Sequence, residues 1–181
     1  MVLALDISTS IIGYTILDLN KNLIDMNYID LRKIKNKDDN IQLFEKVRFA
    51  INELKILLDK YKITNILIEA PLNQVFGTTI LTAIILNKIN SIISFELYKL
   101  GYSLQWINSE TARKKFLGEE YKNFKKISTK GNADAKKEYL TAIVESKLNS
   151  HFETRPQRID KYQPCYYDQA DSYILANYFF D

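Results

Sequence analysis

Histidine and cysteine are almost absent from this chain, which contains one of each among its 181 residues. With His151 as its lone histidine, a single chain cannot build a histidine-based metal site or a histidine-dependent triad. With Cys165 as its lone cysteine, it cannot form an intrachain disulfide, which is typical of a reducing compartment. We therefore expect His151 to be a surface-loop residue, and we assign Cys165 no nucleophilic role.

Long apolar runs are also missing. No window offers the roughly 18 uninterrupted apolar residues of a membrane span, and the N-terminus lacks the order of charged, apolar and small residues found in signal peptides. The net charge is only +3, but residues 110–161 hold 13 Lys and Arg against 8 Asp and Glu, a local net of +5. These features predict a soluble, cytoplasmic protein without membrane contact, folded as one domain over residues 1–181.

The most informative stretch is Val2–Leu17, in which two apolar runs flank the polar loop Ser8–Ser10. Runs rich in Ile, Leu and Val predict buried strands. Gly13 in the second run permits a bulge or the close approach of another backbone. Asp6 lies inside the first run, where desolvating a carboxylate is costly unless its charge is compensated. Asp6 is therefore either a solvated strand-end residue or a ligand for a cation.

The order of the predicted elements indicates an α/β fold with a five-stranded mixed sheet flanked by helices. Three strands joined by turns form an antiparallel meander, and a strand–helix–strand crossover then sets the fourth strand parallel to the first. The predicted strands are Val2–Ile7, Ile12–Leu17, Leu23–Ile29, Ile63–Ile68 and Tyr102–Ile107. The predicted helices are Ile41–Tyr61, Thr78–Leu100, a short one from Ser109 to Gly118, Ala133–Leu148 and Tyr166–Phe180, with a loop over His151–Pro164.

Four acidic residues stand where these elements can converge. Asp6 lies in the first strand, and Glu69 ends the fourth, its predicted parallel neighbour. Asp168 and Asp171 are three residues apart on the last helix and therefore share one face. Alone, each acid has an ordinary interpretation as a solvated residue. A last helix packed across the sheet would gather all four, and four carboxylates at one place cannot all ionise without cations.

The chemistry of this acidic set favours a hard divalent metal. Oxygen-only ligands favour Mg²⁺ or Mn²⁺ over zinc. Two such ions, about 3.5–4 Å apart, hold both the attacking and the leaving oxygen of an in-line phosphoryl displacement. The four acids therefore predict nuclease or phosphotransferase chemistry, with two Mg²⁺ ions in each active site.

The motifs that carry these acids resemble those of the RuvC group of Holliday junction resolvases, within the ribonuclease H-like superfamily. The matching pieces are LALDISTSIIGYTIL, ILIEAP and YDQADSYILANYF, which occur in the family's order and extend the resemblance over nearly the whole chain. The resemblance implies a ribonuclease H-like fold in which Asp6, Glu69, Asp168 and Asp171 are the catalytic metal ligands. It also implies a homodimer that cuts two strands of a four-way junction symmetrically. Because the Thr78–Leu100 helix is apolar on more than one face, it is the expected dimer contact.

The resemblance also implies a set of DNA-binding residues. In the family, an aromatic residue shortly after the strand-end glutamate enters the centre of the junction. The nearest aromatic here is Phe76, seven residues on and past Pro71. The family carries lysines after the fifth strand and at the start of a later helix. The basic residues at those places are Arg113, Lys114, Lys115, Lys136 and Lys137.

Three alternatives stay open on the sequence. The first alternative is a nuclease of broader branched-DNA or RNA–DNA hybrid specificity. Plain ribonucleases H have their second acid on the first helix, and Glu45 stands at that place here. Against this, Glu rather than Asp at the end of the fourth strand favours the resolvases. The opening DISTSIIGYTILD also resembles the phosphate-binding hairpin of sugar kinases and actin-like ATPases, but a second such hairpin is missing. The third is a non-enzymatic, ribonuclease H-like module that binds nucleic acid, against which the intact set of four acids argues.

Overall fold

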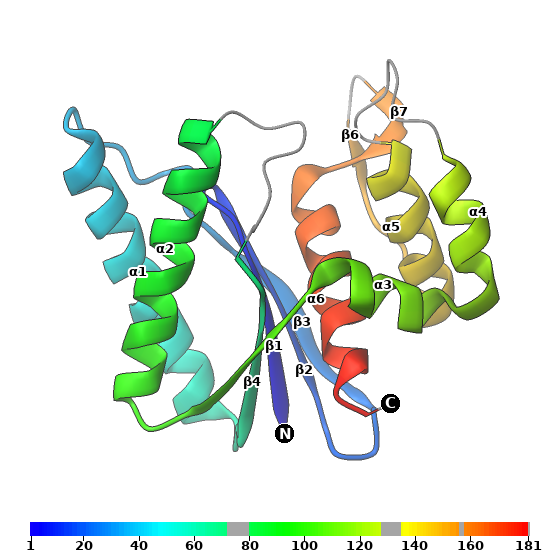
Figure 1. Ribbon diagram of the computed structural model, residues 1–181, viewed down its shortest axis with the longest axis horizontal. Coiled ribbons are helices and arrows are strands. Elements are labelled where there is room, and N and C mark those ends of the chain that lie inside the picture. Colours follow the sequence, from blue (N-terminus) through cyan, green and yellow to red (C-terminus); the bar gives the residue numbers. More distant parts are fainter. Residues whose placement is uncertain (72–79, 128–134, 156–157, 181) are drawn as a thin grey trace.

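The computed structural model describes residues 1–71, 80–127, 135–155 and 158–180, and Figure 1 shows a central sheet between two groups of helices. The sheet has five strands in the order β3-β2-β1-β4-β5. β1 to β3 pair antiparallel, whereas β4 pairs parallel with both β1 and β5. The strands are β1 Val2–Ile7, β2 Ile11–Leu17, β3 Leu23–Asp30, β4 Asn65–Glu69 and β5 Ser103–Ile107. The predicted mixed sheet, three antiparallel strands followed by two parallel ones, is confirmed.

Side chains of β1 alternate between two hydrophobic cores, one on each face of the sheet. Leu3 and Leu5 belong to the first core, whereas Ala4 between them belongs to the second. Because successive strand residues point to opposite faces, Asp6 lies on the same face as Ala4. The same alternation in β4 places Glu69 on this second face, since Leu67 belongs to the second core.

Two long helices, α1 Asp39–Lys60 and α2 Ile80–Lys99, cover the first face of the sheet (Figure 1). The side chain of Asp38 accepts hydrogen bonds from the backbone N–H groups of Asn40 and Ile41 and so caps the start of α1. One side of this helix packs on the sheet. Its buried residues are Val47, Ala50, Ile51, Leu54, Leu57 and Leu58.

α2 buries only one of its apolar sides within the chain. Ile89 and Ile93 are buried in the first core, but Ile80 and Leu81 are 70% and 66% exposed and Ile84 is 46% exposed. Within the part of the chain that the structure describes, the second side is therefore left largely uncovered. Among the described residues, α2 is the one helix long and apolar enough to cross a membrane, a test that core helices of soluble proteins also pass.

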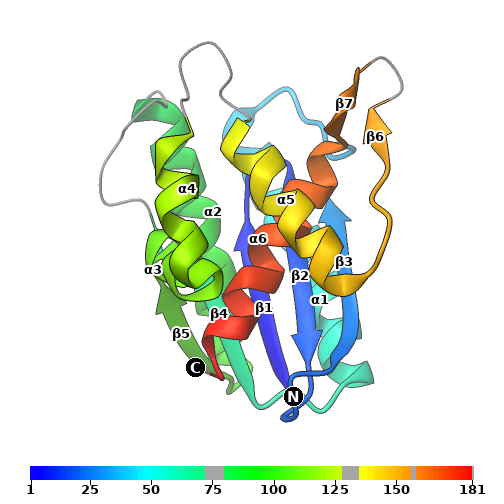
Figure 2. The same cartoon turned by 90° about the vertical axis from the view of Figure 1, so that its right-hand side faces the viewer.

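The second face of the sheet is covered by α6, Pro164–Tyr178, which Figure 2 shows lying across the strands behind a further group of helices. α3 and α5 pack against α6, and α4 follows α3. These elements are α3 Ser109–Leu117, the 3₁₀ turn η1 Gly118–Glu120, α4 Tyr121–Lys126 and α5 Ala135–Leu148. α6 is thus enclosed between the sheet and the outer helices.

Gly13 decides how closely α6 approaches the sheet. A Cβ atom on Gly13 would lie 2.1 Å from the carbonyl oxygen of Asp168, so only glycine leaves room for the α6 backbone. One turn further along this contact, the hydroxyls of Thr15 and Ser172 hydrogen-bond at 2.9 Å. The close backbone approach predicted at Gly13 is confirmed. Because Gly13 pairs with Asp6 across β1 and β2, this contact brings Asp168 to the strand end that carries Asp6.

The segment predicted as a loop before α6 contains a short antiparallel hairpin, so this prediction was wrong. The hairpin consists of β6 Thr154–Arg155 and β7 Arg158–Tyr162. Its sequence has no alternating apolar pattern that would predict strands. The hairpin and the residues beside it are held by contacts with other parts of the chain. The backbone N–H of Tyr162 donates to Glu138 of α5 at 3.2 Å, and the ring of Phe152 stacks on that of Tyr166 with centroids 4.7 Å apart.

Candidate active site

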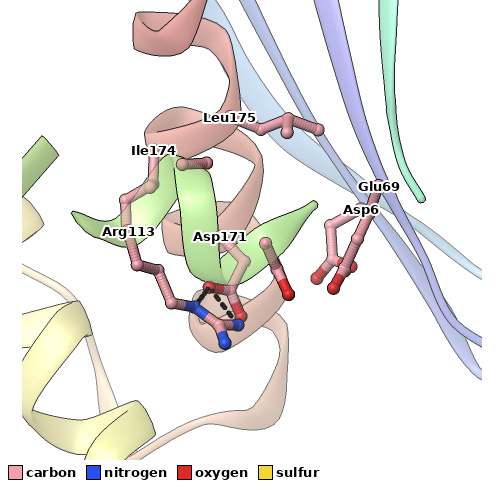
Figure 3. Close-up of a pocket in the computed structure, with 8 residues that line it drawn as sticks. Asp6, Glu69, Arg113, Asp171, Ile174 and Leu175 are labelled. Carbon is pink, nitrogen blue, oxygen red and sulfur yellow. Dashed lines mark hydrogen bonds and ion pairs between the residues drawn. The ribbon is translucent and has the colours of Figure 1, made fainter. Parts of the chain in front are cut away.

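The carboxyl ends of β1 and β4 lie side by side, and each of them carries an acid. The parallel register sets Leu5 beside Ile68, so Asp6 and Glu69 follow on adjacent strands and on the same face. Asp6 is buried, with 7% of its surface exposed. Burial first, and then the carboxylate of Glu69, raise the pKa of Asp6 well above its usual range. Figure 3 shows the two carboxyl groups next to each other on the side of the sheet that faces α6.

Asp168 and Asp171 approach these strand ends from α6, where their spacing of three residues puts them on one face. Burial raises the pKa of Asp168 to about 7; the cation of Lys137 opposes this rise, and the negative charge of Asp171 adds to it. The neighbouring carboxyl of Asp6 also acts on the pKa of Asp168. Asp168 and Asp171 also contribute to the raised pKa of Asp6. The four acids therefore lie close enough together for the charges of the others to act on Asp6 and Asp168.

Arg113 of α3 brings a fixed positive charge into this group of acids. Its Nε and Nη2 atoms both donate to Oδ1 of Asp171, at 3.2 and 2.9 Å. The side chains of Arg113 and Asp171 are only 24% and 15% exposed, so solvent screens the pair little. The carboxylates of Asp171, Glu69 and Asp6 raise the pKa of Arg113 further. The sequence indicated Arg113 only as one of several basic residues after the fifth strand, and its pairing with Asp171 was missed.

A narrow cleft separates the strand-end acids from Asp171 and Arg113 (Figure 3). Its other lining residues are Ser109, Ala112, Ile174 and Leu175. The side chain of Asn108 caps α3 by accepting from the N–H of Thr111, which fixes the first turn of the helix beside the cleft. Ser109 was not singled out in the sequence, since a serine at a helix start is ordinary there.

The chemistry of these residues fits a hard divalent cation. All four side chains offer carboxylate oxygens, the ligands that Mg²⁺ and Mn²⁺ prefer. The raised pKa values of Asp6 and Asp168 mean that these two carboxyl groups retain protons, which a bound cation would displace. Among the described residues, no three His, Cys, Asp or Glu side chains already surround one point at ligand distance. The set therefore fits a metal by its donors and its charge, with side chains that would turn to meet it.

The predicted lysines are distributed around the site rather than within it. Lys137 lies near enough to Asp168 for its charge to act on the pKa of that acid. Lys115 and Lys136 each lie over an aromatic ring, 4.5 and 5.2 Å from its centroid. Lys114 is exposed on α3. None of these four lines the cleft, so Arg113 is the one predicted basic residue that does.

Two other predicted positions do not join the acids. Phe76 lies outside the described residues. Glu45 lies on α1, on the other side of the sheet, where its Oε2 accepts a hydrogen bond from Nδ2 of Asn36 at 3.3 Å. The ribonuclease H arrangement, which would use Glu45 beside the strand-end acids, is therefore not assembled here.

The lone histidine and cysteine lie away from the cleft. The side chain of His151 is 88% exposed, with its Nδ1 atom 3.5 Å from a carboxylate oxygen of Glu145, so the prediction of a surface residue is confirmed. Cys165 is buried in the first turn of α6. Burial raises the pKa of its thiol, which leaves the thiol protonated and poorly nucleophilic.

Comparison with known proteins identifies the fold. No family model and no curated protein matches the sequence. Among solved structures, Thermus thermophilus RuvC in complex with a Holliday junction substrate superposes with a TM-score of 0.59 at 12% identity, covering 99% of this chain and 96% of that one. Another Thermus thermophilus RuvC structure gives 0.55 at 11% identity, covering 98% and 93%. The yeast mitochondrial Holliday junction resolvase Ydc2 gives 0.61 at 15% identity, covering 99% and 77%.

These likenesses confirm a RuvC-type, ribonuclease H-like fold over nearly the whole chain. At identities of 11–15% they establish the fold alone, and the chemistry has to be argued from the residues of this chain.

Proposed function

We propose that the protein is a Mg²⁺-dependent, structure-selective DNA endonuclease that resolves Holliday junctions by paired, symmetric nicks. The observation that carries the proposal is the convergence of four carboxylates, Asp6, Glu69, Asp168 and Asp171, beside one fixed cation at the strand ends of the sheet. The fold is shared with resolvases, and one of these, Thermus thermophilus RuvC, was solved in complex with a Holliday junction substrate.

The acids would hold the metal, and the cations around them would hold the DNA. When bound, Mg²⁺ supplies Lewis-acid activation of water and of the phosphodiester. Asp6 and Glu69 present their carboxylates from rigid strands, and α6 presents the other two. Arg113 lines the cleft and has hydrogen-bond donors of the kind that bind phosphate oxygens. Ile174 and Leu175 close the cleft with apolar surface and limit the access of bulk water.

Charge outside the cleft supports a polyanionic substrate. Residues 110–161, which carry the local net of +5, include α3, α4 and α5, the helices next to the acids. A phosphate backbone would otherwise be repelled by four carboxylates, and surrounding Lys and Arg offset that repulsion and raise the rate of encounter. The paired cuts need two active sites, and we propose that a second copy supplies the other one through the exposed side of α2.

The test is cleavage of labelled DNA by the purified protein in Mg²⁺. We would compare a four-way junction, a Y-fork, a plain duplex and an RNA–DNA hybrid, and use Asp6→Asn as the control that should bind junctions without cutting them. Paired nicks in the junction alone are the expected result. Retained cutting by Asp6→Asn would contradict the role of Asp6.

Other outcomes would redirect the proposal. Cutting of the fork would broaden the substrate to branched DNA in general. Cutting of the hybrid would favour ribonuclease H activity. Tight junction binding without cutting in Mg²⁺ or Mn²⁺ would favour the non-enzymatic module.

A further inference from the structure

A second basic surface lies outside the cleft, where the loop after β3 passes over the outer side of α1. We name it the flank groove. It has a volume of about 380 Å³ and is lined by Lys33, Ile34, Lys35, Glu45, Arg48, Phe49 and Asn52. We propose that the flank groove binds the phosphate backbone of a double-stranded DNA arm, away from the point of cleavage. The inference rests on the proposed function in taking DNA as the substrate.

The charges of the flank groove are mostly uncompensated. Lys33, Lys35 and Arg48 are exposed, and none of them forms an ion pair with a described carboxylate. By contrast, the neighbouring Arg32 is ion-paired, since its guanidinium donates two hydrogen bonds of 2.9 and 2.8 Å to the carboxylate of Asp30. Three cations and one carboxylate, that of Glu45, line the groove, and the charge of Lys33 also acts on the carboxylate of Asp30. Cations without partners on one surface attract a polyanion.

The uncharged residues of the flank groove also suit a nucleic-acid backbone. Ile34 and Phe49 are half-buried and form an apolar floor, against which sugar carbons can pack. Asn52 adds an amide at the rim. Lysine, arginine and asparagine side chains all donate to phosphate oxygens in protein–DNA complexes, and such contacts carry no base specificity. The groove is therefore suited to duplex DNA of any sequence.

Hydrogen bonds connect the flank groove to the active-site end of the sheet. Two residues that neighbour the lining of the groove in the sequence hold the loop that follows the strand of Asp6. Nζ of Lys46, on α1, donates to the carbonyl of Thr9 at 2.7 Å, and the backbone N–H of Leu31 donates to the carbonyl of Ser10 at 2.9 Å. The loop after β3 and the helix α1, which line the groove, thus have a fixed position at the end of the sheet that carries the acids, on the opposite face and next to the β3 edge.

The position of the flank groove predicts the direction in which a bound DNA arm would leave the cleft. β3 and β5 are the two opposite edges of the sheet, so the flank groove lies on the edge away from β5. The cleft and the flank groove lie on opposite faces of the sheet, so an arm that leaves the cleft would reach the groove by crossing the β3 edge. Contacts there would be available only to arms long enough to reach it.

The test compares two charge-matched variants. Lys33→Gln/Lys35→Gln/Arg48→Gln removes the three cations of the groove. Lys55→Gln/Lys60→Gln/Lys62→Gln removes three exposed cations from the opposite end of α1 and beyond it. Both would be made in the Asp6→Asn background to prevent cutting, and thermal melting would check that both fold. Binding would be measured on short-armed junctions, long-armed junctions and linear duplex over a range of salt concentrations.

We expect the groove variant to bind long-armed junctions at least about tenfold more weakly than the control variant. Its slope of log K against log salt should be shallower by about two to three, since each phosphate contact contributes about 0.9. Binding to short-armed junctions should match the control. Equal affinities and equal salt slopes for the two variants on long arms would overturn the inference.

The linear duplex separates this inference from the proposed function. If the protein with Asp6 intact cuts junctions but the groove variant binds like the control, only the flank groove is wrong. If no DNA is cut, yet binding of linear duplex depends on the groove residues, the nuclease is wrong and the groove stands. If neither junction nor duplex binds, both are overturned.

Discussion

At the scale of single residues, Asp6 and Asp168 make the stability of the metal-free fold depend on pH. The pKa of Asp6 lies well above its usual range, and that of Asp168 is raised to about 7. A raised pKa in the folded state means that folding keeps protons that the unfolded chain releases. Below about pH 4 both states are protonated and no stability is lost. As the pH rises from there toward 7, the unfolded chain loses its protons first, so the metal-free fold becomes less stable.

This predicts that Asp6→Asn stabilises the metal-free protein while removing its activity. In a chelating buffer at pH 7 we expect a gain of roughly 1–3 kcal/mol, or about 3–10 °C in Tm, because asparagine, unlike Asp6, does not have to take up a proton or bury a charge when the chain folds. The gain should shrink as the pH falls toward 4. Thermal melting between pH 4 and 8 measures both effects, with the exposed Asp59→Asn as a control that should stay near the wild type. A lower Tm for Asp6→Asn at pH 7 would contradict the charge argument.

At the scale of elements, the contact between α6 and β2 positions half of the site. Asp168 and Asp171 reach the strand ends only because α6 crosses the sheet with its backbone against Gly13. The hydrogen bond between Thr15 and Ser172 fixes the same contact further along. The packing of one helix thus determines where two of the four carboxylates lie.

We therefore predict that Gly13→Ala reduces both stability and cleavage. The added Cβ would overlap the carbonyl of Asp168, so α6 has to shift, at about 1–3 kcal/mol for an overpacked contact. Gly101→Ala is the matched control: Gly101 has φ of +89° and open space around it, so alanine there is strained but displaces nothing. Both variants should lose stability in a melt, but only Gly13→Ala should lose most of its cleavage rate. Equal cleavage by the two variants would show that the position of α6 is not critical.

At the scale of the whole molecule, the helices on the two faces of the sheet differ in the side chains that they present. The α6 face holds the acids and the basic helices, whereas the other face carries α2 with large apolar residues left exposed. Exposed apolar surface of this kind marks interaction sites. A second copy related by a twofold axis would cover it with the same surface and would supply the second active site that paired nicks require.

We predict that the protein is a dimer of 21.1 kDa chains in solution. Leu81→Glu/Ile84→Glu should convert it to a monomer, because two charges would be buried without partners at the interface. Light scattering after size exclusion measures the mass, and Ile56→Glu, at a 60% exposed position on α1, should leave it unchanged. The monomer should nick junctions singly rather than in pairs. A wild-type protein that remains monomeric at all concentrations would contradict this prediction.

The sequence by itself determined most of the strands and helices and drew attention to the four acids, because these depend on local patterns. Apolar runs and helical periods predicted the strands and the long helices, and the crossover rule placed β4 beside β1. Asp6 and Glu69 stood out because a charged residue inside or at the end of an apolar run is conspicuous. Gly13 also stood out, because a residue without a side chain is unusual in a buried strand.

Only the tertiary structure decided which cations meet these acids. Arg113 and Asp171 are separated by 58 residues and by α4, α5 and a hairpin, and no local pattern distinguishes Arg113 from Lys114 or Lys115. The β6–β7 hairpin was missed because its strands are held by α5 rather than by their own sequence. The flank groove is lined by a loop and by one side of a helix, and each of its residues is an ordinary surface residue in the sequence. Such features arise from contacts between distant segments, which become visible only once the chain has packed.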